Sequence, residues 1–529
     1  LFSYKKINTR KHLIKRLIMR KLFKAAIIVT IFSVATRALG FLLRVILSRA
    51  LGAEILGSYQ VAMSIFGVLS TLVASGLPLV VSRSVAYKKS IGKDNEAYST
   101  VTAGLIITLI ISTLVSLIIL LFPQVLDLIF MHGETTSIVL YTLPGLIASA
   151  VYCVLRSSLW GDKHFFAISF TEFFEQVVRI IFCFILFSSF AAGALSLGKK
   201  AALSLSIACI FSSVLVLIVY LCLKNKFANP KRSFKPLLKS STPITALRTC
   251  SSLVQSLIAL IIPIRLTLYG YTSSEAMAQF GMIMGMAFPL IMIPGTLISS
   301  LAVTLVPELS SKTENIDDKS HTKDLSGLKK HIQLGINMSI LISAVFVPGF
   351  MALGRPICEI LFNSSEAGKY VSYAAIIMIP MGINQITGSI LNSIGLELKS
   401  LINYAISATA LLLCIFFLPK YLGTNALIVG MGLMSIISSL LNIRMLKNRN
   451  LLDSSHIKNL CLSYLFALLS SIFGMLLYSL LSKLMHIFIA TLITGILVEG
   501  IMVFLCYIFN LSGIKGFIYF KNVRKRRKN

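Results

Sequence analysis

The sequence predicts an all-α integral membrane protein that crosses the bilayer about fourteen times. Of its 529 residues, 56% are hydrophobic and 13% are charged, and the mean hydropathy of +0.87 exceeds that of soluble globular chains. Apolar segments of about twenty residues recur from Ala25 to Asn510, and each can span a hydrocarbon core of ~30 Å as a helix. Membrane strands would need strict alternation over about ten residues, which the sequence lacks.

The even number of spans places both termini on one side of the membrane. Lys and Arg concentrate in the N-terminus, in the segments 224–239 and 312–330, and in the tail KNVRKRRKN, whereas the alternate connections are poor in cations. The positive-inside rule therefore assigns both termini to the cytoplasm. We expect the protein in the cytoplasmic membrane. The expected spans are approximately 25–50, 56–80, 98–121, 137–158, 165–189, 200–223, 243–269, 277–306, 331–353, 369–394, 399–419, 424–445, 457–481 and 486–510.

These spans divide as six, six and two. The strings LRSSLWGDKHFFAISFTEFF and LNSIGLELKSLINYAISATA occupy the same turn of each half, which indicates two six-helix lobes in the same orientation, an arrangement common among alternating-access transporters. We therefore expect a basic N-terminus (1–24), a first lobe (25–223), a basic linker (224–242), a second lobe (243–445), two further spans (446–510) and a basic tail (511–529).

The basic N-terminal segment has two interpretations. The string HLIKRLIMRKLF spaces its apolar residues as a membrane-surface helix would. The alternative is that translation starts at Met19.

The net charge of +31 is scattered over loops and tails, so we expect no nucleic-acid partner. The nine cysteines form no CxxC pair, so we expect no metal and no cofactor.

Charged residues inside the spans are the first candidates for function, because a charge at the bilayer centre costs from ~3 kcal/mol upward. Arg37 and Arg44 are seven residues apart and share a face of the first span, with Arg49 nearer its outer end. This cationic face lines a hydrated cavity, or it is paired structurally inside the helix bundle.

The string FTEFFEQVVRI places Glu172, Glu175 and Arg179 on one face of the fifth span. The spacing favours an ion pair between Glu175 and Arg179 and leaves Glu172 for another helix, such as an arginine of the first span. This charge network is either part of a cavity or a neutral structural element.

Two further charges lie in the second half of the chain. Arg265 follows Pro263 toward the outer end of the seventh span. The sequence leaves open whether its side chain faces the cavity or another part of the helix bundle. Glu499 lies deep in the last span and is a candidate ion or proton site, with a simple partner role as the alternative.

Helix-breaking residues occur at matching places in the two halves. The second span ends with Gly76 and Pro78, and the eighth, also the second of its half, contains Pro289, Pro294 and Gly295. Broken helices are tolerated where the freed backbone groups find protein, water or a cavity, so we expect hinges there. The alternative is that these prolines only kink membrane helices that do not move.

No motif of an enzyme occurs in the loops, and we expect no enzymatic activity.

Several strings resemble a known family: TRALGFLLRVILSRALGAEILGSYQVA, GLPLVVSRSVA and FPLIMIPGTLISSLAVTLVPELS. They are similar to the stage V sporulation protein B family, in the polysaccharide-transporter branch of the multidrug/oligosaccharidyl-lipid/polysaccharide exporter superfamily. Lipid II flippases are a neighbouring family. The resemblance implies two six-helix lobes around a central cavity, and translocation of an undecaprenyl-pyrophosphate-linked saccharide. It also implies that Arg37, Arg44 and Arg49 handle the pyrophosphate.

The leading hypothesis is thus a flippase for a peptidoglycan precursor of the spore cortex or cell wall, with the first-span arginines and Arg265 holding the pyrophosphate. Its partners would be the lipid-linked oligosaccharide, membrane lipids and cell-wall synthesis proteins. A second hypothesis is a cation-coupled multidrug exporter that uses Glu172, Glu175 and Glu499. A third is a non-transporting membrane scaffold in sporulation. An exporter of cationic drugs requires an acidic cavity, whereas the first-span charges are basic.

Overall fold

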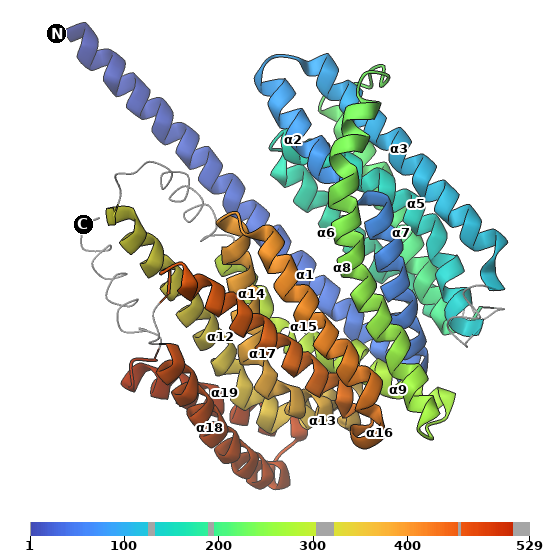
Figure 1. Cartoon of the computed structure of the whole chain (residues 1–529), viewed down its shortest axis with the longest axis vertical. Coiled ribbons are helices and arrows are strands. Elements are labelled where there is room, and N and C mark those ends of the chain that lie inside the picture. Colours follow the sequence, from blue (N-terminus) through green and yellow to red (C-terminus); the bar gives the residue numbers. More distant parts are fainter. Residues whose placement is uncertain (1, 125–132, 189–194, 303–321, 453–455, 512–529) are drawn as a thin grey trace. The chain divides into compact units, whose positions relative to one another are not determined.

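Long α-helices make up the protein (Figure 1), a computed structural model that describes residues 2–124, 133–188, 195–302, 322–452 and 456–511. Side chains are described from 28 onward in these ranges, except at 133, 247, 322–326 and 456–458. No strand occurs in the described ranges. The chain divides by its internal packing into unit 1, Leu1–Leu260, and unit 2, Ile261–Asn529. The expected tail at 511–529 lies outside the described residues except for Leu511.

Unit 1 contains the first helices in chain order. They are α1 (Phe2–Ala74), α2 (Leu77–Ser90), α3 (Asp94–Leu121), α5 (Gly133–Gly161), α6 (Phe165–Phe187), α7 (Leu197–Cys222) and most of α8 (Phe234–Leu268). Helix α1 contains one non-helical residue, Gly52, at φ 69° and ψ 175°, where two helical stretches meet at a kink. That backbone conformation is open to glycine at no steric cost.

Helix α5 is the centre of unit 1 and packs against α1, α2, α3 and α7. Small polar residues form its contact with α7. The Ser206 hydroxyl donates to the Tyr141 carbonyl at 2.7 Å, and two helical turns further on Ser213 donates to the Ala148 carbonyl. The backbone N–H of Gly145 donates to Ser206 at 3.2 Å. Such residues let membrane helices approach closely and supply hydrogen bonds where water is absent.

Unit 2 is organised around the long helix α12 (Thr322–Phe362), which packs against α13, α14, α18 and α19 (Figure 1). The described helices of this unit also include an N-terminal group, α9 (Ser273–Phe280), the π-helix η2 (Gly281–Ala287) and α10 (Phe288–Ile291). After α12 follow α13 (Ser365–Ala374), the short 3-10 turn η3 (Ala375–Ile377), α14 (Met378–Ser393), α15 (Glu397–Phe417), α16 (Pro419–Leu422), α17 (Asn425–Asn448), α18 (His456–Leu484) and α19 (Ile487–Ile508). The last two helices pack on each other as well as on α12.

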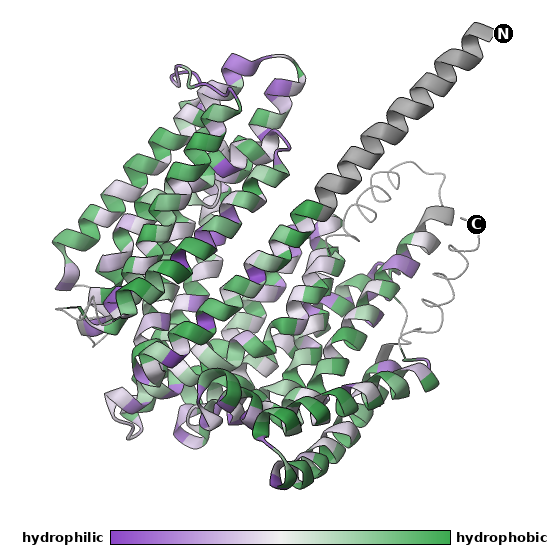
Figure 2. Cartoon of the chain, turned by 180° about the vertical axis from the view of Figure 1, so that it is seen from behind, coloured by the Kyte–Doolittle hydropathy of each residue, from purple (hydrophilic) through white to green (hydrophobic). Residues whose placement is uncertain are grey.

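Hydrophobic residues run along the length of these helices (Figure 2). Large hydrophobic side chains are exposed along α18, for example Leu465 at 50%, Ile472 at 55% and Leu476 at 62%. Apolar area of this extent in water costs ~25 cal/mol per Å2, so lipid rather than water is the solvent of this surface. The protein is a multi-span membrane protein.

Eleven described helices are long and apolar enough to cross a membrane, or twelve if the bent pair Ser273–Ile291 and Ile293–Ala302 forms one span. This number is lower than the expected fourteen for two visible reasons. The segment Ile28–Ser90 is counted as one candidate span, where the sequence predicts two. Helix α6 is not among the eleven, and it carries three charged residues.

Candidate functional site

The first helix and α6 pack along a shared apolar face in unit 1. The ring of Phe32 lies 5.7 Å from that of Phe166 and 5.4 Å from that of Phe173, in edge-to-face contacts. Two turns further along α1, Gly40 faces the side chain of Gln176 at 4.0 Å. The helical repeat therefore brings the next residue of this row, Arg44, to the level of Arg179 on α6.

Arg44 and Arg179 are brought together beside a buried tyrosine. Arg179 Nη2 donates a hydrogen bond of 2.7 Å to the hydroxyl of Tyr59, whose side chain is 3% exposed. Arg44 lies within electrostatic reach of both Arg179 and Tyr59. The Nε of Arg179 is buried and has no hydrogen-bond partner among the described residues. Two guanidinium groups thus lie within electrostatic reach of each other and of the same tyrosine hydroxyl.

The partner of Glu172 corrects the sequence expectation. Glu172 forms an ion pair with Arg156 of α5, whose Nη2 donates to Glu172 Oε1, and not with an arginine of the first helix. Arg156 also lies over the ring of Trp160, 5.9 Å from its centroid. The reason is the tight α5–α6 turn, which brings the end of α5 back beside the start of α6.

Arg156 is the charged residue of this site that sequence reasoning missed. A signal was available, since Arg156 falls inside the apolar span expected at 137–158. Its place only two residues from the end of that span made it look like an ordinary interface residue. Its partner lies on another helix, and local spacing does not predict such a contact.

Glu175 keeps the electrostatic contact with Arg179 that its spacing predicts. Its carboxylate is also within hydrogen-bonding reach of Ser212 on α7. The hydrogen bond of Arg179 goes to Tyr59 instead, so the two groups share an electrostatic interaction while each has a separate polar partner. The three charges of α6 are therefore tied to three different helices.

We group six charged residues of α1, α5 and α6 under the name α1–α6 charge cluster: Arg37, Arg44, Arg156, Glu172, Glu175 and Arg179. Four arginines stand against two glutamates, so the six residues of the cluster carry a formal net charge of +2. Arg37 is exposed and has no hydrogen bond or ion pair with another described residue. The cluster is thus suited to an anionic group rather than to a cation.

The other two arginines of the expected site, Arg49 and Arg265, are not members of this cluster. Arg49 is exposed, one and a half turns beyond Arg44 on α1. Arg265 belongs to unit 2, where its guanidinium lies 4.2 Å from the ring centroid of Phe416 and 5.0 Å from that of Tyr269. Its Nη2 donates to the Tyr269 hydroxyl. Aromatic contacts of this kind hold a guanidinium in place by cation–π attraction.

Glu499 of α19 packs against α12. A Cβ atom on Gly349 would lie 2.4 Å from Glu499 Oε1, so the absence of a side chain at this position makes room for the carboxyl group. The other oxygen, Oε2, is buried without a hydrogen-bond partner among the described residues. A buried carboxyl group without a hydrogen-bond partner lowers the stability of the folded protein. Glu499 therefore either has a function that outweighs this loss or simply destabilises the fold.

We expect Glu499→Met to raise the stability of the folded protein by about 1 to 3 kcal/mol, because it removes an unsatisfied polar group and keeps the side-chain volume. Thermal unfolding in detergent measures this change. Gly349→Ala serves as the counterpart, since its methyl group would crowd the carboxyl and lower the melting temperature. A lower melting temperature for Glu499→Met would show that the carboxyl group is satisfied.

The expected hinges coincide with breaks in the helices. Gly76 lies between α1 and α2 as the N-cap of α2, and Pro78 is in the first turn of α2. In unit 2 the two helical segments around Met292 meet at 45°, preceded by the π-helix η2, and Pro289 and Pro294 flank the bend. Proline and π-helical geometry both explain a kink of this size. Movement at these sites stays a prediction.

The arm beyond this bend is tied to α14. Gln385 of α14 donates to the Ser299 hydroxyl at 2.6 Å, and its Oε1 lies 3.0 Å from where a Cβ of Gly295 would be. Gly295, expected as a hinge residue, thus also permits the close approach of a side chain. The bent helix therefore has its second arm fastened to the neighbouring helix α14.

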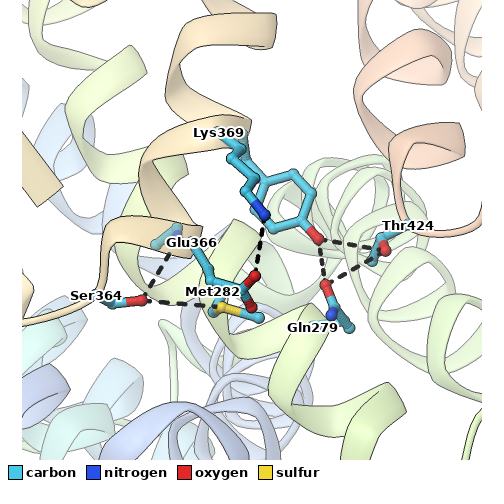
Figure 3. Close-up of polar contacts among 8 residues, drawn as sticks. Gln279, Met282, Ser364, Glu366, Lys369 and Thr424 are labelled. Carbon is cyan, nitrogen blue, oxygen red and sulfur yellow. Dashed lines mark hydrogen bonds and ion pairs between the residues drawn. The ribbon is translucent and has the colours of Figure 1, made fainter. Parts of the chain in front are cut away.

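A second polar cluster fastens the first arm of the same bent helix (Figure 3). The Tyr370 hydroxyl of α13 donates to Gln279 Oε1 of α9 and lies 3.4 Å from the Thr424 hydroxyl at the start of α17. Nearby, Lys369 and Glu366 form an exposed ion pair of 3.0 Å within α13. These contacts join three helices of unit 2 at one end, and the sequence had given no indication of them.

Comparisons with known proteins agree with this architecture. A family model described as "Polysaccharide biosynthesis protein" matches residues 22–313, more than half of the chain. Stage V sporulation protein B of Bacillus subtilis (strain 168) is 25% identical over 365 residues, which cover 66% of this chain and 69% of that protein. Sporulation protein YkvU of the same organism is 23% identical over 367 residues, covering 67% and 78%.

Two solved structures share the fold. One is the lipid II flippase MurJ in an inward closed conformation, with a TM-score of 0.69 at 15% identity, covering 92% of this chain and all of that one. The other is a multidrug resistance MATE family transporter of the MOP superfamily, facing inward, with a TM-score of 0.62 at 17% identity, covering 78% and 94%. The chain thus shares its fold with a flippase and a transporter.

The resemblance read from the sequence strings is thereby confirmed. The matched residues 22–313 contain the whole α1–α6 charge cluster and both arms of the bent helix up to Ala302. The chain belongs to the polysaccharide biosynthesis protein family.

Proposed function

We propose that this protein moves an undecaprenyl-pyrophosphate-linked saccharide, a peptidoglycan precursor resembling lipid II, across the cytoplasmic membrane by alternating access. The substrate would serve spore cortex or cell-wall synthesis. The observation that carries this proposal is the surplus of arginine over glutamate in the α1–α6 charge cluster. The relationship to a sporulation protein and the fold shared with a lipid II flippase support the same assignment.

Arginine is suited to the pyrophosphate for a geometric reason. Its planar guanidinium donates two parallel hydrogen bonds to a phosphate oxygen pair, and it is more weakly hydrated than an ammonium group. Arg37 and Arg44 would supply these donors, with Arg49 and Arg265 as further candidates. A pyrophosphate bound there would neutralise the net positive charge of the cluster, and its lipid tail would stay in the bilayer.

The span arrangement that we propose has fourteen helices, divided as six, six and two. Dividing Ile28–Ser90 at the kink of Gly52 adds one span to the twelve candidates, and counting α6 adds another. The charges of α6 all have partners on neighbouring helices, which removes the main objection to placing it in the membrane. Both termini would then lie in the cytoplasm, next to the cation-rich connections.

The test is reconstitution of the wild-type protein in vesicles that contain fluorescent lipid II. A membrane-impermeant quencher measures how fast the label crosses to the accessible leaflet. Flipping that is faster than in protein-free vesicles, and that stops after heat inactivation of the protein, supports the proposal. Equal rates with and without protein contradict it.

The same vesicles separate the alternatives. Efflux of a cationic dye under a sodium or proton gradient, without lipid II flipping, would indicate a multidrug exporter. Neither activity, in vesicles that contain correctly folded protein, would indicate a scaffold. The basic charge of the α1–α6 charge cluster favours the flippase over the exporter, because a cationic drug would be repelled there.

A further inference from the structure

A basic pocket lies in unit 1, and none of its lining residues belongs to the α1–α6 charge cluster. It has a volume of about 480 Å3 and is lined by α2, the first turns of α3 and the start of α8, whose ends can be followed in Figure 1. Three cations line it: Arg83 and Lys88 of α2, and Arg232 just before α8. No acidic side chain is among its lining residues.

The polar part of this pocket has the chemistry of a phosphate site. Lys88 Nζ donates to the Thr100 hydroxyl at 2.8 Å, and the hydroxyls of Ser84 and Ser240 also line the cavity. Glu96 lies nearby, but its carboxylate forms an ion pair of 3.0 Å with Lys93. The same carboxylate also interacts electrostatically with Lys88 and Arg232. A single acid thus faces four cations, and the pocket keeps a positive charge.

The start of α8 adds to this preference for anions. The pocket is lined by Ser233 and by residues of the first two turns of α8, and this helix runs over 35 residues. The first backbone N–H groups of a helix have no partner within it and carry partial positive charge. Of the residues at this helix start that line the pocket, Pro236 has no N–H and Leu237 donates its N–H to the Ser233 carbonyl at 3.1 Å. The start of α8 therefore contributes the positive end of its dipole rather than free N–H donors.

The remaining wall of the pocket is apolar. Val80, Leu237 and Ile244 line it on the side of the helix bundle. A phosphate held by the cations could thus carry an apolar substituent against this wall. The pocket lies among the cation-rich segments that the positive-inside rule assigns to the cytoplasmic face, where anionic lipids attract basic residues.

We propose that this pocket binds a phosphate group, supplied by the headgroup of an anionic membrane lipid, at a site separate from the proposed transport site. The phosphate contacts Arg83 and Arg232, with Lys88 and the helix start behind it. A bound lipid would join α2, α3 and α8 at their common end. The site does not depend on whether the protein flips a lipid-linked saccharide.

The test is native mass spectrometry of the full chain, purified free of lipid, with phosphatidylglycerol or phosphatidylcholine of the same acyl chains. The wild type should retain one phosphatidylglycerol and discriminate against phosphatidylcholine. In the double variant Arg83→Gln/Arg232→Gln the affinity should fall about one hundredfold, tenfold for each charged hydrogen bond lost. Both arginines are exposed, and unchanged melting temperatures confirm that this variant is folded.

The matched control is Lys231→Gln/Lys239→Gln. It removes the same charge from neighbouring exposed positions that do not line the pocket, and it should bind phosphatidylglycerol as the wild type does. A second variant, Ser240→Phe, fills the cavity without changing the charge and should also lose the lipid. Equal loss in the two double variants would overturn the proposal, since it would show diffuse attraction to the basic surface.

Titration with inorganic phosphate and pyrophosphate separates the two sources of the phosphate group. Displacement of phosphatidylglycerol by millimolar phosphate supports a shared site. Tight binding of the soluble anions alone, lost in Arg83→Gln/Arg232→Gln, keeps the pocket as a phosphate site but assigns it a soluble ligand. Binding of neither lipid nor soluble phosphate by the wild type contradicts the proposal.

Discussion

Replacing Arg44 with alanine is expected to slow translocation of a lipid-linked saccharide about one hundredfold, with the protein still folded. Two charged hydrogen bonds to the pyrophosphate would be lost, at ~1.5 kcal/mol or more each, and 1.4 kcal/mol corresponds to a factor of ten. Arg44 is exposed in unit 1 and lies within electrostatic reach of Arg179, so its removal also relieves repulsion between the two guanidinium groups. Fluorescent lipid II in vesicles reports the rate.

Arg37→Ala is expected to act in the same direction, because Arg37 is exposed and has no other partner among the described residues. Arg44→Lys should fall between wild type and Arg44→Ala, since an ammonium group keeps the charge and loses the bidentate geometry. Arg444→Ala, an exposed arginine of α17 outside the cluster, is the control for loss of one positive charge. If all these variants flip at the wild-type rate, the arginines are structural.

Gly76→Ala is expected to destabilise the folded protein by about 1 to 3 kcal/mol, because the new methyl group would overlap the backbone of α8. A Cβ at this position would lie 2.3 Å from the backbone oxygen of Ser241 and 2.4 Å from the Thr245 hydroxyl. Backbone cannot move aside as a flexible side chain can, so α8 would have to shift. The hydrogen bond of 3.2 Å from the Gly76 N–H to Thr245 would be lost with it.

Gly67→Ala is the matched control. It lies inside α1 with no atom within 4 Å of its Cβ position, and alanine there should be neutral or stabilise the helix by up to ~1 kcal/mol. Thermal unfolding in detergent, followed by circular dichroism, gives both values. Equal melting temperatures for the two variants would mean that α2 and α8 are held less closely than these distances imply.

This packing also bears on the expected hinge. The break between α1 and α2 is attached to α8 twice, through Gly76 and through Arg248, which donates to the Ser75 carbonyl at 3.1 Å. A change of angle at this break would therefore carry α8 with it. The sequence predicted the break from Gly76 and Pro78, but it could not predict its attachment to α8.

Much of the candidate site followed from the sequence, because helical spacing is a local property. The common face of Glu172, Glu175 and Arg179, and the alignment of Arg37 with Arg44, depend only on a repeat of 3.6 residues. Membrane character likewise follows from the length of each apolar segment. These features required no knowledge of which helices touch.

Tertiary structure alone decided the partners of those charges. Glu172 pairs with Arg156, and Arg179 with Tyr59, across sequence separations of 16 and 120 residues. Contacts between helices depend on which faces pack, and the hydropathy of a span that is apolar on all sides does not specify a face. By itself, then, the sequence determined a basic, many-span membrane protein, and only the packing of α1, α5, α6 and α7 decided which partners the charges of the site have.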